Sequence, residues 1–224
     1  MPMPDKTVTH AATSRAAKAA ETRQRLVAAA VDLFSARSYE QVAAADIAKA
    51  AGVAHGLLFH YFGSKRGIYL QAIREAVDQL DAAFSFEPEL PPAQQLRRAL
   101  ASNLRYLSSR RGLALRLVLG GRGADPEAWE VFESGRWRAL GATWSMLGLD
   151  PENHALRMTG RAAVAAIDEA TIYWLHNERE FSVEAMVGYM VELMAAGLRS
   201  AATLDPSLDT AASVRRLLGS GRGQ

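Results

Sequence analysis

Residues 46–65 read DIAKAAGVAHGLLFHYFGSK, a pattern that predicts two short helices joined by a tight turn. Ile47 and Ala51 share one helical face, and Gly52 supplies the left-handed backbone conformation that the turn requires. A second helix is expected over residues 54–62, with apolar side chains one turn apart for packing. A helix docked across a shorter one is a helix-turn-helix, whose second helix enters the major groove of DNA.

The sequence on both sides of this motif also indicates helices. An upstream helix is expected to begin at Ser14 or Thr22 and to end at Ala36, and a longer helix is expected from about Lys65 past Leu80. Alanine, leucine, arginine and glutamate dominate the chain, and the alternation typical of strands is scarce. We therefore predict an all-α fold.

Helix start and stop signals divide the rest of the chain. Asp-Pro-Glu triplets at 125–127 and 150–152 combine an N-cap residue, a proline suited to the first turn and an acidic side chain. Further helices are expected over residues 92–107, 111–119, 125–148, 155–176 and 182–202. Residues 1–14 suggest a flexible arm, and residues 205–224 suggest a frayed, disordered tail.

The composition excludes several classes of protein. The chain has 224 residues, 49% hydrophobic and 22% charged, and it contains no cysteine, which removes disulfide frameworks and thiolate metal sites. The longest stretch without Asp, Glu, Lys or Arg runs from Ala50 to Ser64, and it is shorter than the ~18 residues of a membrane-spanning helix. The first residues do not have the shape of a signal peptide. We expect a soluble, cytoplasmic protein without a membrane partner.

The formal charge of +2 is distributed unevenly along the chain. Residues 1–75 contain 10 basic and 6 acidic side chains, whereas the remainder contains 16 basic and 18 acidic ones. A basic end is compatible with a nucleic-acid footprint, although a difference of this size also arises by chance.

Motifs for enzymatic chemistry are missing from the sequence. It has no HExxH, GxSxG, P-loop or dinucleotide fingerprint, and the glycine-rich residues 120–123 lack the lysine of a phosphate loop. The five histidines do not cluster at metal-ligand spacings. We therefore expect neither an enzyme, nor a metal site, nor a cofactor.

The segment ADIAKAAGVAHGLLFHYFGSKRGIY, residues 45–69, resembles the DNA-binding region of TetR-family transcriptional regulators. The matching positions are Ile47, Ala48, Ala51, Gly52, Val53, Gly56, Phe59, Tyr61, Phe62 and Lys65, and upstream Ala29, Ala30, Leu33, Phe34 and Tyr39. The resemblance covers about residues 22–72. Two features depart from the family pattern: residues 43–45 are Ala-Ala-Ala where a capping Thr or Ser is usual, and His55 and Leu57 replace smaller residues.

The resemblance implies that residues 54–62 form the recognition helix. His55 and His60 then face base edges or phosphates, and Leu57 suits contact with a thymine methyl group. The implied DNA-binding residues are His55, Gly56, Leu57, Phe59, His60, Tyr61, Lys65, Lys49, Arg15, Lys18 and Arg23. Lys65 opens a helix, where backbone N–H groups add to the attraction for phosphate. Alternatives stay open for three of them: Phe59 as core, His60 as a packing residue and Lys49 as a solvated surface lysine.

The resemblance also implies a C-terminal body that dimerises and binds a ligand. The last two predicted helices, at 155–176 and 182–202, carry small and apolar residues suited to a homodimer interface. The alternative is that they are core helices of a monomer. Candidate ligand-binding residues are the aromatic and charged side chains Tyr106, Arg116, Trp129, Trp137, Trp144, Asp168, Tyr173 and Trp174. For Asp168 the favoured alternative is structural pairing with Arg161, Arg116 or the dimer mate.

Taken together, the sequence predicts an N-terminal three-helix helix-turn-helix domain at 15–75 and a helical ligand-binding and dimerisation domain at 76–204. The expected function is sequence-specific regulation of transcription, as a repressor released from a palindromic double-stranded operator by a small-molecule effector. The alternative is a helical small-molecule-binding or scaffold protein with little affinity for DNA.

Overall fold

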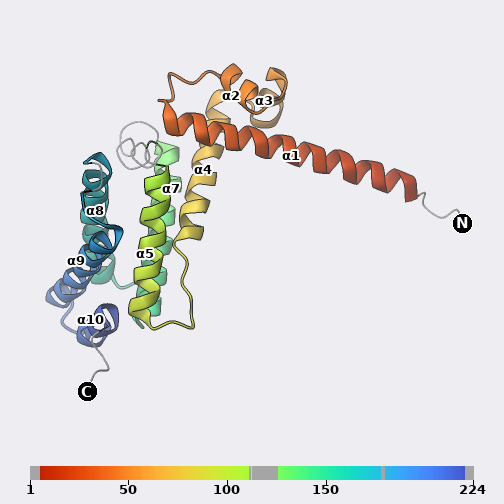
Figure 1. The fold of residues 1–224 in the computed structure, drawn as a ribbon. Helices are drawn as coiled ribbons and strands as arrows, with labels where there is room; N and C mark the ends of the chain where they lie inside the picture. The colour runs from red at the N-terminus through yellow and green to blue at the C-terminus, as the bar shows by residue number, and fades with distance from the viewer. Residues whose placement is uncertain (1–5, 111, 113–125, 178–179, 220–224) are drawn as a thin grey trace, which may run out of the picture. The chain divides into compact units, whose positions relative to one another are not determined.

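The structure is a computed structural model, and it describes residues 6–110, 112, 126–177 and 180–219, with side chains from residue 16 onward except Ala128. These described residues form helices and no strand, which confirms the all-α prediction. The chain separates into two compact units, residues 1–76 and residues 77–224. Figure 1 shows the helices of both units in chain order.

The first unit is built from helices α1 (Lys6–Ala36), α2 (Ala44–Ala50), α3 (His55–Phe62) and the beginning of α4 (Lys65–Ala83). Its core contains side chains that are fully or almost fully buried, namely Leu26, Ala30, Val31, Phe34, Val42, Ile47, Leu58, Ile68 and Ile73. Buried positions recur three and four apart on α1, and Ile68, Ala72 and Ala76 recur four apart on α4, so each helix turns one apolar face inward.

The first helix begins earlier than the sequence suggested. Residues 6–14, expected as a flexible arm, belong to α1, which is continuous from Lys6 to Ala36. The alanine-rich sequence between residues 11 and 20 has a high intrinsic helix propensity, and no glycine or proline interrupts it.

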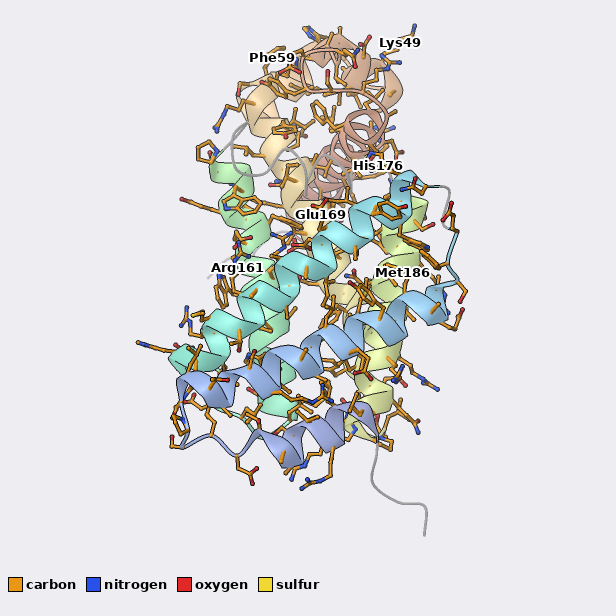
Figure 2. All side chains as sticks on the ribbon, turned by 90° about the vertical axis from the view of Figure 1, so that its left-hand side faces the viewer. Lys49, Phe59, Arg161, Glu169, His176 and Met186 are labelled. Carbon is orange, nitrogen blue, oxygen red and sulfur yellow. The ribbon has the colours of Figure 1, made fainter. Side chains whose placement is uncertain are left out.

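The second unit contains the end of α4 together with α5 (Pro92–Ser109), α7 (Pro126–Met146), α8 (His154–His176), α9 (Val183–Leu204) and α10 (Thr210–Leu218). Helices α8 and α9 lie side by side, and α9 also packs against α5 and α10 (Figure 2). The core is formed by α5, α7, α8, α9 and α10, with Leu96, Leu104, Trp144, Leu156, Met190 and Leu198 among its buried side chains.

Helix α8 does not start at the second Asp-Pro-Glu triplet. The Asp150 carboxylate accepts the N–H of Glu152 at 3.0 Å, which makes the triplet a turn. Asn153 caps α8 instead, because its side-chain oxygen accepts the N–H groups of Ala155 at 2.9 Å and Leu156 at 3.1 Å. Helix α9 starts as expected, since the Ser182 hydroxyl oxygen accepts the N–H of Ala185 at 3.1 Å.

The prediction of a disordered tail from residue 205 is wrong for the described residues, because α10 lies within it. Asp209 caps this helix by accepting the N–H of Ala211 at 3.2 Å, and the left-handed Gly219 ends it. Val214 and Leu217, three residues apart, are buried in the core of the second unit. The sequence around this helix is rich in small and polar residues, so its composition did not indicate an apolar helix face.

Two expected features, the helix at 111–119 apart from residue 112 and the N-cap residue Asp125, lie outside the described residues. No helix in the described part of the chain is long and apolar enough to cross a membrane.

Candidate nucleic-acid interface and effector cavity

The turn between α2 and α3 has the geometry that the sequence predicts. Gly52 has φ of 66°, and its N–H donates to the carbonyl of Lys49 at 3.1 Å. The N–H of Val53 donates to the carbonyl of Ala48 at 3.0 Å, which closes the end of α2. Leu58 of α3 is fully buried, and it fixes which face of α3 points outward.

The outward face of α3 carries several of the expected DNA-binding residues. His55, Gly56 and His60 are exposed, Phe59 is 42% exposed, and Leu57 is half-buried. The rings of His55 and Phe59 meet edge to face, with centroids 5.1 Å apart. Phe59 is therefore not a core residue, and this alternative from the sequence is corrected.

Other helices of the first unit carry exposed basic side chains. Lys49 on α2 and Lys18 on α1 are exposed, and Lys49 projects from the surface together with Phe59 (Figure 2). Arg23 is exposed too, but its guanidinium lies 5.3 Å from the centre of the Phe62 ring and donates to the Gln71 side chain at 3.1 Å. The side chain of Arg15 lies outside the described residues.

Lys65 is held at the start of α4 by a contact that the sequence did not reveal. Its ammonium group lies 4.2 Å from the centre of the Tyr39 ring, which orients the side chain through a cation–π interaction. Tyr39 in turn packs edge to face on Tyr69 at 4.9 Å. Tyr61 is half-buried beside the exposed His60, with ring centroids 5.1 Å apart. The aromatic positions around Lys65 were visible in the sequence, but their contact depends on the fold.

Helix α2 has only half of a capping arrangement. Ala43 provides no side-chain acceptor, while the Asp46 carboxylate accepts the N–H of Ala43 at 3.3 Å. The missing hydroxyl therefore leaves the helix formed and removes one polar group from its N-terminus.

The second unit contains a partly open, apolar cavity of about 140 Å³ between α4, α5, α7, α8 and α9. Most of its wall is aliphatic or aromatic, and the polar members are Asp81, Asn103, Arg136, Thr143, Asp168 and Thr171. An apolar wall with a few polar groups is typical of small-molecule sites. Val77, Leu80 and Asp81 of this wall belong to α4, whose first residues are part of the first unit.

Among the expected ligand-binding residues that the structure describes, Asp168 is the only one that lines this cavity. Trp144 and Trp174 are buried in the core, where the Trp174 N–H donates to the carbonyl of Phe181 at 2.7 Å. Trp137 and Trp144 line a smaller hollow, and Tyr173 is 58% exposed. The Tyr106 hydroxyl donates to the Gln79 side chain at 3.1 Å, Trp129 packs on Phe132, and Arg116 lies outside the described residues. The rings of Trp144 and Trp174 are thus buried by packing against neighbouring side chains and do not line the cavity.

Asp168 pairs with Arg136 of α7, which was not among the partners considered from the sequence. Arg136 also binds Glu133 at 2.7 Å, and Glu133 binds Arg161 at 2.8 Å. Burial, which outweighs the attraction of Arg136, raises the pKa of Asp168 from 3.8 to about 6. This chain of alternating charges joins α7 to α8 at one end of the cavity.

A shallow groove runs along the outer side of α8 and α9. Its lining contains no charged side chain among the described residues, and Met158 and Leu204 are 62% and 52% exposed. Ala162, Ala166 and Ala196 also lie exposed in it. The helix at 182–202 was expected to contribute apolar residues to a homodimer interface. Most of these residues are instead buried in the core of their own chain, namely Val187, Met190, Val191, Met194, Ala195 and Leu198.

Comparison with known proteins places these features in a family. Residues 26–72 match the family described as "Bacterial regulatory proteins, tetR family". The transcriptional activator FasR of Mycolicibacterium smegmatis is 25% identical over 80% of this chain and 83% of its own length. The Bacillus subtilis fatty acid metabolism regulator protein is 22% identical over 79% of this chain and 95% of its own length.

Solved structures agree with this result. A tetR-family transcriptional regulator from Streptomyces coelicolor superposes with a TM-score of 0.77 at 27% identity, covering 89% of each chain. The chain belongs to the TetR family. Bacillus subtilis FadR in complex with stearoyl-CoA shares the fold, with a TM-score of 0.64 at 22% identity over 78% of this chain and 98% of that one.

This TetR-family chain is a ligand-responsive, DNA-binding transcriptional regulator. The relatives named above are regulators of transcription and metabolism, a family without enzymatic activity. In the described part of the chain, no group of three or more His, Asp or Glu side chains lies close enough to hold a metal ion.

Proposed function

We propose that the protein is a repressor that binds a palindromic operator as a homodimer and is released by an apolar effector. The observation that carries the proposal is the exposed face of α3, which presents His55, Gly56, Phe59 and His60 to solvent. The turn before α3 has the left-handed Gly52 that a helix-turn-helix requires. A recognition helix of this kind reads base edges, while the surrounding lysines bind phosphates.

The homodimer supplies the second half-site. One helix-turn-helix makes few base contacts, so two copies related by a two-fold axis are needed for selectivity. The uncharged groove on α8 and α9 suits this contact because it exposes Met158, Leu204 and a row of alanines. Within each copy, Gly197 permits the close packing of α8 on α9, since a Cβ there would lie 3.3 Å from the carbonyl oxygen of Thr159.

The effector is proposed to occupy the cavity of the second unit. Its aliphatic wall fits the hydrocarbon part of a ligand, and the related Bacillus subtilis FadR was crystallised with stearoyl-CoA. Because α4 contributes to this wall, a ligand that favours one position of α4 changes the population of DNA-binding states. Release requires the effector to bind the non-binding state more tightly than the operator-bound state.

The test is a mobility-shift titration of the full chain on the DNA flanking its own gene, at several salt concentrations. We expect specific binding, and an affinity that falls steeply with salt because phosphate contacts release counterions. The alternative, a helical binding protein with little DNA affinity, draws support from the missing cap at Ala43. It would replace our proposal if neither specific nor non-specific binding appears at low salt.

A further inference from the structure

One end of the effector cavity is polar, and its charges are arranged asymmetrically. Asp168 and Arg136 face the cavity, whereas Glu133 and Arg161, which complete the chain of ion pairs, do not line it. A ligand therefore meets one carboxylate and one guanidinium, and their remaining hydrogen-bonding capacity determines what it must offer.

Arg136 already pairs with two carboxylates. One terminal nitrogen binds Glu133 at 2.7 Å and the other binds Asp168. Phe132 lies 4.0 Å from the guanidinium carbon, and Trp129 lies 5.4 Å from it, so aromatic rings cover the group. A ligand carboxylate would therefore be the third carboxylate at one guanidinium, and it would meet Asp168 as a like charge.

Asp168 has capacity left for a donor. Arg136 binds its Oδ2 atom, while Oδ1 has no hydrogen-bond partner among the described residues. The nearby hydroxyl groups do not serve it, because Thr171 donates to Ile167 and Thr143 donates to Ala139, both at 2.8 Å. The raised pKa of Asp168 agrees with this geometry, because the surroundings do not fully compensate the burial of its charge.

The charges of the cavity lining are balanced by their ion-pair partners. The charged side chains among the described lining residues are Asp81, Asp168 and Arg136, so this lining carries one net negative charge. Arg138 neutralises Asp81 through a hydrogen bond, but Arg138 is 57% exposed and does not line the cavity. Because Arg138 balances Asp81 and Arg161 balances Glu133, the preference for a donor depends on the free Oδ1 atom of Asp168 and not on a net potential.

We propose that the effector is an apolar molecule with a hydrogen-bond donor, an amine or a hydroxyl group, and that this donor binds the carboxylate of Asp168. The inference rests on the proposed effector cavity and specifies the chemistry of its ligand. It separates such a ligand from free fatty acids and from simple esters, which share the hydrocarbon part and lack the donor.

The test uses four probes with the same ten-carbon chain, namely decylamine, decan-1-ol, methyl decanoate and decanoate. Their dissociation constants are measured by calorimetry on the full-length protein without DNA, below the concentration at which the probes aggregate. We expect decylamine and decan-1-ol to bind at least about tenfold more tightly than decanoate and methyl decanoate, the effect of one hydrogen bond to a charged group. Equal affinities across the series, or a preference for decanoate, would overturn the proposal.

Asp168→Asn provides a sharper test, because the amide keeps the shape and replaces a free acceptor by a donor. In this variant the preference for decylamine should disappear, and methyl decanoate should gain affinity relative to decylamine. Glu184→Gln is the matched control: it removes a carboxylate that is 74% exposed and paired with Arg105 on the surface. If this control also loses the preference, general attraction of cations explains the binding, and the assignment to Asp168 fails.

These measurements are independent of operator binding. If the unmodified protein binds its operator but shows no preference for decylamine and decan-1-ol, only the inference about the effector is rejected. If it does not bind DNA, the proposed function is rejected. Circular dichroism of each variant verifies that it is folded, and the probe series on the unmodified protein decides the inference even if Asp168→Asn does not fold.

Discussion

At the scale of single residues, Asp168 combines burial, pairing and titration in the physiological range. The carboxylate is 24% exposed and faces Arg136 and Glu133 on α7 and Arg161 on its own helix. Its pKa in the folded protein, about 6, lies above its value of 3.8 in an unfolded chain. The folded state therefore binds a proton more readily than the unfolded state, and ionisation of Asp168 opposes folding.

This sign predicts how stability depends on pH. The contribution of Asp168 is fully present below pH 3.8 and is lost as the pH rises through about 6. Between pH 5 and pH 7.5 the unmodified protein should lose roughly 1 to 1.5 kcal/mol of unfolding free energy relative to Asp168→Asn. Urea unfolding of both proteins at the two pH values measures the difference. Parallel changes in the two proteins would show that Asp168 does not titrate as described.

Lys65 is a predicted phosphate contact whose side chain the fold already orients. Its ammonium group rests over Tyr39 at the first residue of α4. We expect Lys65→Ala to weaken binding to all DNA sequences alike and to reduce the slope of log K against log salt by about one. Lys65→Arg keeps the charge and should keep the slope. An unchanged slope in Lys65→Ala would remove Lys65 from the phosphate contacts.

The sequence predicted the surroundings of some of these residues better than those of others. Lys65 follows from its place in a short, specific motif, because local spacing determines it. The partner of Asp168 could not be predicted, since Arg136 lies on another helix and the pairing depends on how α7 and α8 pack. The tryptophans were misleading for the same reason: their size was visible, but whether a ring faces a cavity or the core is set by tertiary packing.

At the scale of elements, the first residue of a helix depends on which of several polar residues serves as its N-cap. Asp150 and Asn153 both have side chains suited to an N-cap, and the structure uses Asn153. Helix α10 was missed because it is short and lies in a polar segment. Its packing nevertheless ties the end of the chain to the core: Ser213 and Arg216 both donate to the carbonyl of Leu147, at 3.3 Å and 3.1 Å.

Helix α10 is therefore expected to contribute to the stability of the second unit. Leu217 is fully buried, and Leu217→Ala should lower the free energy of unfolding by about 2 to 5 kcal/mol, the usual effect of truncating a buried leucine. Arg215→Ala on the exposed side of the same helix is the control and should change stability by less than ~0.5 kcal/mol. Denaturant unfolding measures both. Equal stability of the two variants would mean that α10 is not part of the cooperative core.

At the scale of the whole molecule, prediction from sequence was strongest for the first unit. Its turn needs Gly52, its packing needs Leu58, and these requirements are local enough to leave a readable pattern. The second unit has no comparable motif, because many combinations of apolar residues fill a helical core equally well. The positions of its longer helices were predictable, while α10, the cavity and the free surface became clear only from the structure.

The proposed homodimer is the property of the whole molecule on which the proposed operator selectivity depends. In a two-fold symmetric interface, each residue near the axis occurs twice and meets a copy of its own surroundings. Ala166 is exposed in the uncharged groove on α8 and α9. Ala166→Glu therefore places two buried carboxylates in the proposed interface, while each separate chain keeps an exposed, helix-compatible side chain.

We expect Ala166→Glu to be a folded monomer by light scattering and to lose roughly a thousandfold or more in affinity for the operator, approaching non-specific binding. Ala142→Glu adds the same charge at an exposed position on α7, outside the groove, and should remain dimeric with its operator affinity retained. A dimeric Ala166→Glu would place the contact elsewhere on the surface. A monomer that keeps full operator affinity would show that one helix-turn-helix suffices, because no second half-site could then be occupied by the same particle.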